Sequence, residues 1–350
     1  VRKGHYVRIL DNLEPQVHHS GKAPAYLNKS EDVEFVRCSV LDYAAFKKAI
    51  ADIDVVFHEA ARVGVGQSMY ETASYVDTNI KGTANLLNLL VNENHSIKKV
   101  LIAGSMSSYG EGAYNCSNCG IVSPPLRSDE QMRQGRWELV CKSCSQELKP
   151  VPTSESKPLQ PNSIYAITKH VQEEMLICIG KAYGIPCVSL RYFNIYGPRQ
   201  SLSNPYTGVA AIFMSRIKNN RSPVIFEDGM QTRDFVSVHD VVAANILAME
   251  SKAADYEIFN VGTGKPVSIK AVAETIARIY GKSVQPEVTN KFRKGDVRHC
   301  FADISKIRSR LGFEPRVSFE EGMKELTRWA EHAEAIDMLD KATDELKSKG

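Results

Sequence analysis

Along the first hundred residues, short apolar runs alternate with longer stretches whose apolar positions recur every three or four residues. The runs have the length of strands and the stretches have the spacing of helices. The predicted elements are strands at 6–11, 33–40, 54–61 and 99–105 and helices at 41–50 and 71–92. Strands this apolar are covered on both faces, so the pattern predicts a parallel sheet between two helical layers. Ligands bind such sheets at the carboxyl ends of the strands.

The alternation resumes after residue 160. The later elements are predicted as a helix at 163–181, a strand at 187–192, a helix ending at 220, a strand at 224–227, a helix at 238–251, a strand at 257–261, helices near Ile269, Ile304 and Phe319, and an exposed helix in the last twenty residues. A chain of 350 residues is long enough for two domains. We expect a cofactor domain at 1–185 and a smaller α/β substrate domain at 186–350, with some later segments returning to the sheet.

Composition narrows the classes of partner. A net charge of +3 gives no support for a nucleic acid or an anionic membrane as partner. No apolar run approaches the roughly 18 residues that a membrane helix needs. Of eight cysteines, four form two Cys-x-x-Cys pairs and four stand singly in apolar surroundings. This usage favours a metal site in a reducing cytoplasm over a disulfide framework.

Tyr165 and Lys169 are the candidate reactive pair. They lie four residues apart on one predicted helix and therefore point to the same face. A neighbouring ammonium favours the phenolate, so we expect the tyrosine pKa to fall and Tyr165 to act as a general base toward an alcohol. Ser105 ends a buried predicted strand, where its hydroxyl can hold the substrate oxygen. In isolation the tyrosine–lysine spacing is common by chance, and a surface tyrosine beside a solvated lysine is then the favoured explanation.

Several stretches together make the chain resemble the extended short-chain dehydrogenase/reductases, the nucleotide-sugar epimerase and dehydratase group, outside residues 113–150. They are ILDNL at 9–13, HEAA at 58–61, TNIKGT at 78–83, GSMSSYG at 104–110, YAITK at 165–169, LRYFNIYGPRQ at 190–200, TRDFVSVHD at 232–240, FNVGTG at 259–264 and RKGDVRHCFAD at 293–303. The resemblance implies a Rossmann-like, doubly wound sheet, bound NAD, a nucleotide-sugar substrate and a homodimer.

The resemblance also implies residue roles. Its catalytic set is Ser105, Tyr165 and Lys169. Its cofactor-binding set is Asp11, Asn12, Ser39, Val40, Ala60, Ala61, Asn79, Tyr165, Lys169 and Tyr192. Its substrate-binding set is Ser105, Asn194, Arg233, Arg293, Asp296 and Cys300. The planar guanidinium of arginine suits the diphosphate, an acid at the end of the second strand suits a ribose, and Cys300 would gate the sugar pocket.

The chain departs from the family pattern at its beginning. The family opens with a strand and a GxxGxxG loop under the cofactor pyrophosphate, whereas the first match here is already the second strand. About two dozen residues are therefore expected to precede the sequence, and truncation is favoured over an NAD-free protein. Ser39 also replaces an acid that is frequent on the adenine side, which weakens that contact.

The insertion at 113–150 carries Cys116, Cys119, Cys141 and Cys144. Two Cys-x-x-Cys turns at this separation resemble a zinc ribbon with a closed four-thiolate site, which is structural rather than catalytic. Four free thiols or two redox pairs are the alternatives. Basic and acidic side chains in the insertion nearly balance, which disfavours nucleic-acid binding.

The residues directly after Ser105 indicate the type of reaction. In the family, dehydratases carry an Asp-Glu pair there and decarboxylases a Glu, but this chain has Met106, Ser107 and Ser108. We therefore expect 4-epimerisation through a 4-keto sugar. The stretch at 203–213 and the insertion are more similar to dTDP-L-rhamnose 4-epimerases than to UDP-glucose 4-epimerases. A dehydratase or reductase of the same fold, or a non-catalytic sensor of NAD or nucleotide sugar, remains as an alternative.

Overall fold

A four-stranded parallel sheet forms the centre of the computed structural model, which describes residues 1–18, 20–204, 206–333 and 335–349. In spatial order its strands are β12 (Glu257–Val261), β8 (Cys187–Tyr192), β4 (Lys99–Ser105) and β3 (Val55–His58). Every residue of β4 and β8 is buried, as their apolar sequences predicted. The register pairs Ser105 with Tyr192, so the carboxyl ends of these strands meet at one edge.

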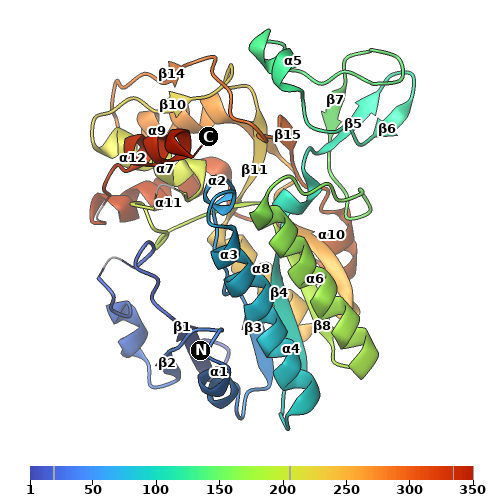
Figure 1. The fold of residues 1–350 in the computed structure, drawn as a ribbon. Coiled ribbons are helices and arrows are strands. Elements are labelled where there is room, and N and C mark those ends of the chain that lie inside the picture. The colour runs from blue at the N-terminus through green and yellow to red at the C-terminus, as the bar shows by residue number, and fades with distance from the viewer. Residues whose placement is uncertain (19, 205, 334, 350) are drawn as a thin grey trace.

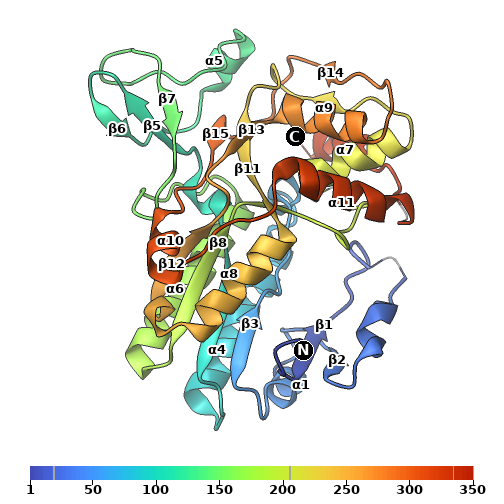
Figure 2. The same cartoon turned by 180° about the vertical axis from the view of Figure 1, so that it is seen from behind.

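Helices cover both faces of this sheet. Figure 1 shows α4 (Gly82–Asn92) and α6 (Ile164–Tyr183) in front of it, and Figure 2, seen from the opposite side, shows α8 (Val238–Glu250) and α10 (Ser305–Leu311) on the other face. Ser163 begins α6 because its hydroxyl accepts a hydrogen bond from the Ala166 amide. Gly184 ends α6 in the left-handed conformation with φ of 67°, which a glycine adopts without strain.

The first two strands stand apart from the central sheet. β1 (Val7–Asp11) and β2 (Val33–Arg37) pair in parallel with one another, and α1 (Tyr43–Ala49) comes after them. Among the described residues no strand pairing joins β1 or β2 to β3. A cavity of about 1370 Å³ is lined by β1 on one side and β3 on the other. A short 3-10 helix, Ala25–Lys29, connects the two strands.

The predicted helix at 71–92 contains a change of winding. After α2 (Val65–Ser68), α3 (Thr72–Tyr75) continues through a π-helical turn, Val76–Lys81, into α4. Such turns often accompany functional sites. Gly82 comes directly after the π turn. This position requires a glycine, because a Cβ there would lie 2.5 Å from the Val40 side chain.

The second half of the chain builds a smaller unit around β11 (Thr232–Ser237). β9 (Asn194–Tyr196) and β15 (His299–Cys300) pair with β11 in parallel, and β13 (Pro266–Ser268) pairs with it antiparallel. The surrounding elements are α7 (Val209–Lys218), β10 (Val224–Ile225), the 3-10 turn Lys252–Ala254, α9 (Ile269–Ile279), β14 (Glu287–Val288), α11 (Phe319–Glu331) and α12 (Leu339–Ser348).

Two predictions for this half differ from the structure in extent. The strand predicted at 224–227 ends at Ile225, because Glu227 takes a positive φ of 56°. The helix predicted for the last twenty residues is confined to α12, which begins at Leu339. Residue 350, the last residue of the predicted helix, lies outside the described part of the chain.

The insertion projects from the carboxyl end of β4, beyond the 3-10 turn Met106–Tyr109 (Figure 1). It is a three-stranded antiparallel sheet of β5 (Ala113–Cys116), β6 (Gly120–Val122) and β7 (Lys149–Val151), with one short helix, α5 (Asp129–Arg133). Its own core is small and contains Tyr114, Leu139 and Leu148 beside two of its cysteines. The insertion lies next to β15 in both ribbon views.

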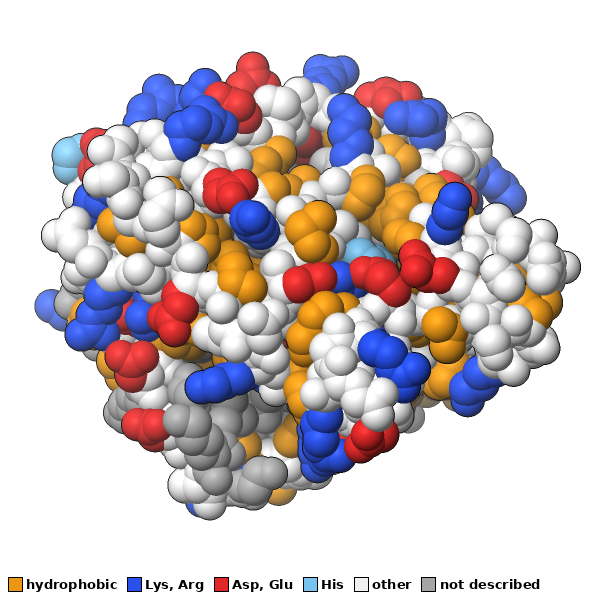
Figure 3. Space-filling view, turned by 90° about the horizontal axis from the view of Figure 1, so that it is seen from above, with side chains coloured by type: hydrophobic (Ala, Val, Ile, Leu, Met, Phe, Trp, Pro, Cys, Tyr) orange, Lys and Arg blue, Asp and Glu red, His pale blue; other side chains and the backbone are white. Residues whose placement is uncertain are grey.

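The face seen in Figure 3, which carries the insertion and the smaller unit, mixes basic, acidic and hydrophobic side chains. Lysine and arginine side chains lie among aspartate and glutamate rather than in one stripe on this face. Within the described residues, no helix combines the length and the hydropathy that a membrane crossing requires.

Candidate active site

Ser105, Tyr165 and Lys169 are brought together where β4 ends against the first turns of α6. Ser105 is buried and caps the 3-10 turn Met106–Tyr109 by accepting a hydrogen bond from the Ser107 amide. The Tyr165 amide donates to the Ser68 hydroxyl at 3.0 Å, which fixes the beginning of α6 against α2. The Lys169 side chain lies one turn further along α6 and is 3% exposed. The predicted catalytic residues therefore share one site.

Burial controls the proton affinities in this site. It raises the pKa of Tyr165, and a hydrogen bond with Ser105 offsets part of that increase. It lowers the pKa of Lys169 to about 8, while the carboxylates of Glu59 and Glu173 act in the opposite direction. The expected decrease in the tyrosine pKa was wrong for this structure, because desolvation of the phenolate outweighs the hydrogen bond with Ser105. A lysine with a pKa near 8 can give or take a proton close to neutrality.

Glu59 is a site residue that the sequence patterns did not single out. It comes directly after β3, and its carboxylate accepts a hydrogen bond from the Tyr192 hydroxyl at 3.0 Å. Desolvation raises the pKa of Glu59, and the nearby charge of Lys169 lowers it in part. An acid immediately after an apolar strand was the available signal. On the other face of β3, burial lowers the pKa of His58 to about 3, so this histidine is neutral and bonds Thr83.

Six of the predicted cofactor residues line the cavity between β1 and β3. They are Asp11, Asn12, Ser39, Val40, Ala60 and Ala61. Asp11 ends β1, and its carboxylate accepts a hydrogen bond from the Leu13 amide at 2.7 Å. A carboxylate at the end of a strand, beside a cavity of this size, fits the ribose of a dinucleotide.

Asn79 and Tyr192 use their polar atoms inside the protein. The side-chain oxygen of Asn79 accepts a hydrogen bond from the Arg62 amide. Its side-chain nitrogen donates to the Arg62 carbonyl and, at 2.9 Å, to the Thr168 hydroxyl. Asn79 therefore ties the segment after β3 to α6 and is fully buried. The Tyr192 hydroxyl lies 3.0 Å from both Glu59 and Asn245. Both residues position the walls of the site.

The predicted substrate residues lie along β9, β11 and the segment before β15. Asn194 begins β9, and its buried amide oxygen has no hydrogen-bond partner among the described residues. Arg233 in β11 donates to the carbonyl oxygens of Val297 and Arg298. The Arg293 guanidinium is 2.9 Å from the Asp296 carboxylate and stacks on Phe226. Both arginines are anchored by the segment that precedes Cys300.

Cys300 does not lie on an open pocket wall. Its side chain has no exposed surface and belongs to the main hydrophobic core, and burial raises its pKa to about 12. β15 pairs Cys300 with Arg233, and its role as a gate of the sugar pocket stays a prediction.

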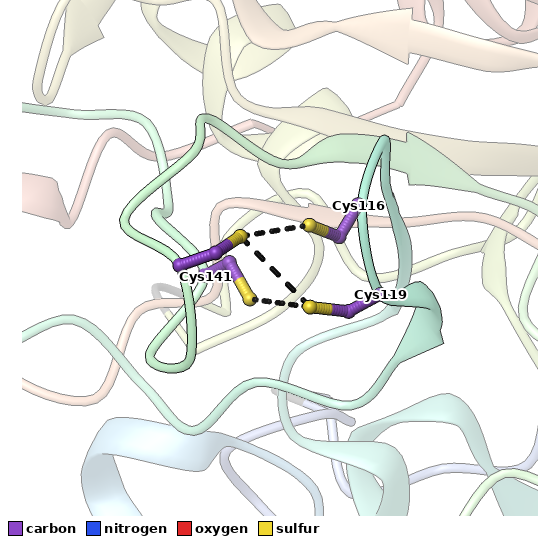
Figure 4. A group of neighbouring side chains, drawn as sticks. Cys116, Cys119 and Cys141 are labelled. Carbon is purple, nitrogen blue, oxygen red and sulfur yellow. Dashed lines mark hydrogen bonds between the residues drawn. The ribbon is translucent and has the colours of Figure 1, made fainter.

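The insertion gathers its four cysteine sulfurs into one cluster. All four lie within 4.8 Å of one another, with distances of 3.4 Å for Cys116–Cys144, 3.8 Å for Cys141–Cys119 and 3.9 Å for Cys119–Cys144. Figure 4 shows Cys116 and Cys119 facing Cys141 across the cluster. A tetrahedral zinc ion with bonds of about 2.3 Å separates its sulfurs by about 3.8 Å, so the cluster fits that ion. Backbone amides of Ser143 and Cys144 lower the pKa of Cys141 to about 6 and favour its thiolate.

Similarity to known proteins agrees with this geometry. Residues 1–129 match the NAD dependent epimerase/dehydratase family, and residues 146–326 match the GDP-mannose 4,6 dehydratase family. The chain is 34% identical to a dTDP-L-rhamnose 4-epimerase of Burkholderia thailandensis, over 94% of this chain and 88% of that protein. The chain belongs to the NAD-dependent epimerase/dehydratase family of extended short-chain dehydrogenase/reductases.

Solved structures of this family share the fold. The UDP-glucose 4-epimerase of Thermotoga maritima with UDP-glucose superimposes with a TM-score of 0.73 at 30% identity, covering 94% of this chain and 92% of that one. The UDP-glucuronic acid 4-epimerase of Bacillus cereus with UDP-glucuronic acid and NAD gives 0.75 at 26% identity, with 94% and 92% covered. The predicted family, Rossmann-like fold class and enzyme class are confirmed. Residues 130–145 of the insertion lie outside both family matches.

Proposed function

We propose that this epimerase/dehydratase family member is a nucleotide-sugar 4-epimerase that uses NAD to oxidise C4 of the sugar transiently. The observation that carries the proposal is the convergence of Ser105, Tyr165 and Lys169 at the end of β4, without a carboxylate in the adjoining turn. That turn contains Met106, Ser107 and Ser108. A dehydratase needs an acid–base pair to expel the 6-hydroxyl, and none is supplied at this place.

The side chains have separable tasks in this reaction. Tyr165 acts as its phenolate, which the Ser105 hydrogen bond stabilises against the cost of burial, and accepts the proton of the sugar 4-hydroxyl. Ser105 holds the same sugar oxygen by a hydrogen bond. The Lys169 ammonium stabilises negative charge on the tyrosine oxygen as the proton moves. NAD, when bound, supplies the reversible oxidation of C4. If the 4-keto sugar turns over before it is reduced, the hydroxyl returns on the other face of the ring, and Tyr165 gives back the proton.

The cofactor site is supported by the cavity between β1 and β3. Asp11 and Asn12 would hold the adenosine ribose, and Ser39 and Val40 would border the adenine. Ala60 and Ala61, just beyond β3, leave room for the backbone of a bound dinucleotide. The glycine-rich loop that cradles the pyrophosphate in this family is not among these 350 residues.

For the substrate, we favour a dTDP-6-deoxyhexose such as dTDP-L-rhamnose, with a UDP-hexose as the second candidate. The first is supported by the relative named a dTDP-L-rhamnose 4-epimerase, and the second by the similar UDP-glucose 4-epimerase structure. Arg233 and Arg293 would bind the diphosphate and Asp296 the nucleotide ribose. Asn194 offers its unpaired buried oxygen toward the sugar.

We also propose that Cys116, Cys119, Cys141 and Cys144 hold one structural zinc ion. The sulfur distances and the set of four thiol ligands support a closed site. Protein prepared without chelator should contain about one zinc per chain, measured by plasma mass spectrometry, and Cys119→Ser should lose it. Metal-free protein with four titratable thiols would contradict this proposal. A homodimer remains a prediction, to be checked by light scattering.

Product analysis by NMR tests the proposed reaction. The purified protein would be incubated with NAD and a panel of dTDP- and UDP-hexoses without added reductant. A C4 epimer of one sugar is the expected result. A stable 4-keto product would identify a dehydratase, and net consumption of NADH would identify a reductase. No change with any sugar, despite bound NAD, would favour a sensor instead.

A further inference from the structure

We propose that the cysteine-bearing insertion positions the diphosphate-binding arginines of the substrate site through a buried ionic contact, here called the arginine bridge. The bridge consists of Arg127 and Glu138 from the insertion and Glu227 and Arg298 from the smaller unit. The proposal rests on the proposed function, because it assigns the bridge a role toward a nucleoside diphosphate.

The first half of the bridge is a paired contact between Arg127 and Glu227. The two terminal nitrogens of Arg127 lie 2.7 and 2.9 Å from the two carboxylate oxygens of Glu227. The side chains are 0% and 2% exposed, respectively. Two parallel charge-assisted hydrogen bonds fix both distance and orientation, so the contact is geometrically specific. The same guanidinium donates to the Asp296 carbonyl at 3.0 Å.

The second half joins Glu138 to Arg298 and His299. Arg298 donates to one Glu138 oxygen, and the other oxygen lies 3.1 Å from the His299 ring. Arg298 is 1% exposed and also contacts Glu227 at 3.0 Å, which closes the bridge. Both terminal nitrogens of Arg298 also donate hydrogen bonds to the Asp228 carboxylate. Arg127, Glu227 and Arg298 are thus desolvated together, and Glu138 joins them through a side chain that is 37% exposed.

Both candidate diphosphate arginines depend on the segment that the bridge holds. Arg233 donates to the carbonyl oxygens of Val297 and Arg298, which adjoin the bridged Arg298 side chain. Arg293 pairs with Asp296, whose carbonyl oxygen accepts from Arg127. A shift of the insertion would therefore move the supports of both guanidinium groups. Figure 1 shows the insertion next to β15.

The cysteine cluster gives the insertion the rigidity that such a role needs. Arg127 and Glu138 lie in the segment between the two cysteine pairs, and the insertion has few buried hydrophobic side chains of its own. Because its hydrophobic core is so small, the sulfur cluster must define where these two side chains stand. Residues 130–145, outside both family matches, therefore influence a site that the family shares.

The test compares Arg127→Lys and Glu138→Gln with two controls on the exposed surface of the insertion, Arg136→Lys and Glu147→Gln. Arg127→Lys keeps the charge and loses the paired geometry, and Glu138→Gln keeps the shape and loses the charge. Binding of UDP and of dTDP to the full chain would be measured by calorimetry, with zinc content and thermal unfolding measured alongside. For the sugar nucleotide found by NMR, KM and kcat would be measured separately.

We expect both bridge variants to weaken binding of the preferred nucleoside diphosphate by about 3- to 30-fold, with a matching rise in KM and little change in kcat or zinc content. The controls should bind like the wild type. Unchanged binding in both folded variants, with a lower unfolding temperature alone, would overturn the positioning role and leave the proposed function intact. Failure of the wild type to bind either UDP or dTDP would instead overturn the proposed function, and the role of the bridge with it.

Discussion

Two of the regions that bury cationic side chains, the end of β4 and the arginine bridge, differ in how they pair these charges. At the end of β4, the Lys169 ammonium has no ion pair or hydrogen bond among the described residues, and burial lowers its pKa to about 8. In the arginine bridge, the Arg127 and Arg298 guanidinium groups meet carboxylates directly, and hydrogen bonds to Asp228 and Glu138 raise the pKa of Arg298 despite its burial.

On the proposed function and the proposed role of the bridge, the difference separates a site for chemistry from a site for position. An unpaired buried charge is destabilising, but its proton affinity comes near the working pH, as a catalytic group requires. A fully paired charge has no accessible proton transfer, but its geometry is fixed and its disruption leaves an uncompensated partner. Substitutions in the two regions test this contrast, beginning with the largest expected effect.

Tyr165→Phe should lower kcat by about 1000-fold, because it removes the hydroxyl that exchanges the proton with the sugar. Steady-state kinetics on the identified sugar nucleotide would measure the change, and circular dichroism would verify the fold. Tyr183→Phe is the matched control, since Tyr183 lies on the same helix and is 57% exposed. Activity of Tyr165→Phe within a few-fold of the wild type would contradict the proposed mechanism.

Arg298→Met should lower the free energy of unfolding by about 3–5 kcal/mol, because it leaves the Glu138, Glu227 and Asp228 carboxylates without their shared cation. Urea denaturation would measure the effect. The control Arg310→Met removes an exposed arginine 3.7 Å from Glu257 and should change stability by no more than about 0.5 kcal/mol. Equal stability of the two variants would remove the distinction between paired and surface charges.

Lys169→Met should have the opposite consequence for stability, with a defined pH dependence. Since the pKa falls from 10.5 to about 8 on folding, the unfolded chain binds the extra proton between these values. The stability of the wild type relative to Lys169→Met should therefore rise by about 2–3 kcal/mol from pH 8 to pH 10.5, and stay constant below pH 8. Denaturant titrations at several pH values measure this difference. Lys181→Met, on the exposed end of the same helix, is the control.

Glu59→Gln is expected to have the smallest effect. The Glu59 carboxylate raises the pKa of Lys169 against the larger effect of burial. Its neutralisation should lower that pKa further, so the high-pH decline of kcat moves to lower pH. The control is Glu174→Gln, whose side chain is 68% exposed on α6. A pH profile that is identical in all three proteins would mean that Lys169 titration does not limit turnover.

Much of the central architecture was predictable because local patterns and burial agree there. The predicted strands at 99–105, 187–192 and 257–261 coincide with β4, β8 and β12, and Ser163 begins the predicted helix that carries Tyr165. Short strands such as β9, β13 and β15 were not predicted, since two or three residues give no periodicity. The π turn at Val76–Lys81 was not predicted either, because it lies inside a continuous helical pattern of apolar positions.

The sequence alone determined the family, the enzyme class, the candidates for the reactive trio and the grouping of the four cysteines, because each depends on residue types at short, fixed spacings. Only the tertiary structure decided the proton affinities, the burial of Cys300 and the contact between the insertion and the segment before β15. These depend on desolvation and on partners far apart in the chain, as between Arg127 and Glu227. A side chain's neighbours across the fold determine its charge state, and local sequence does not encode them.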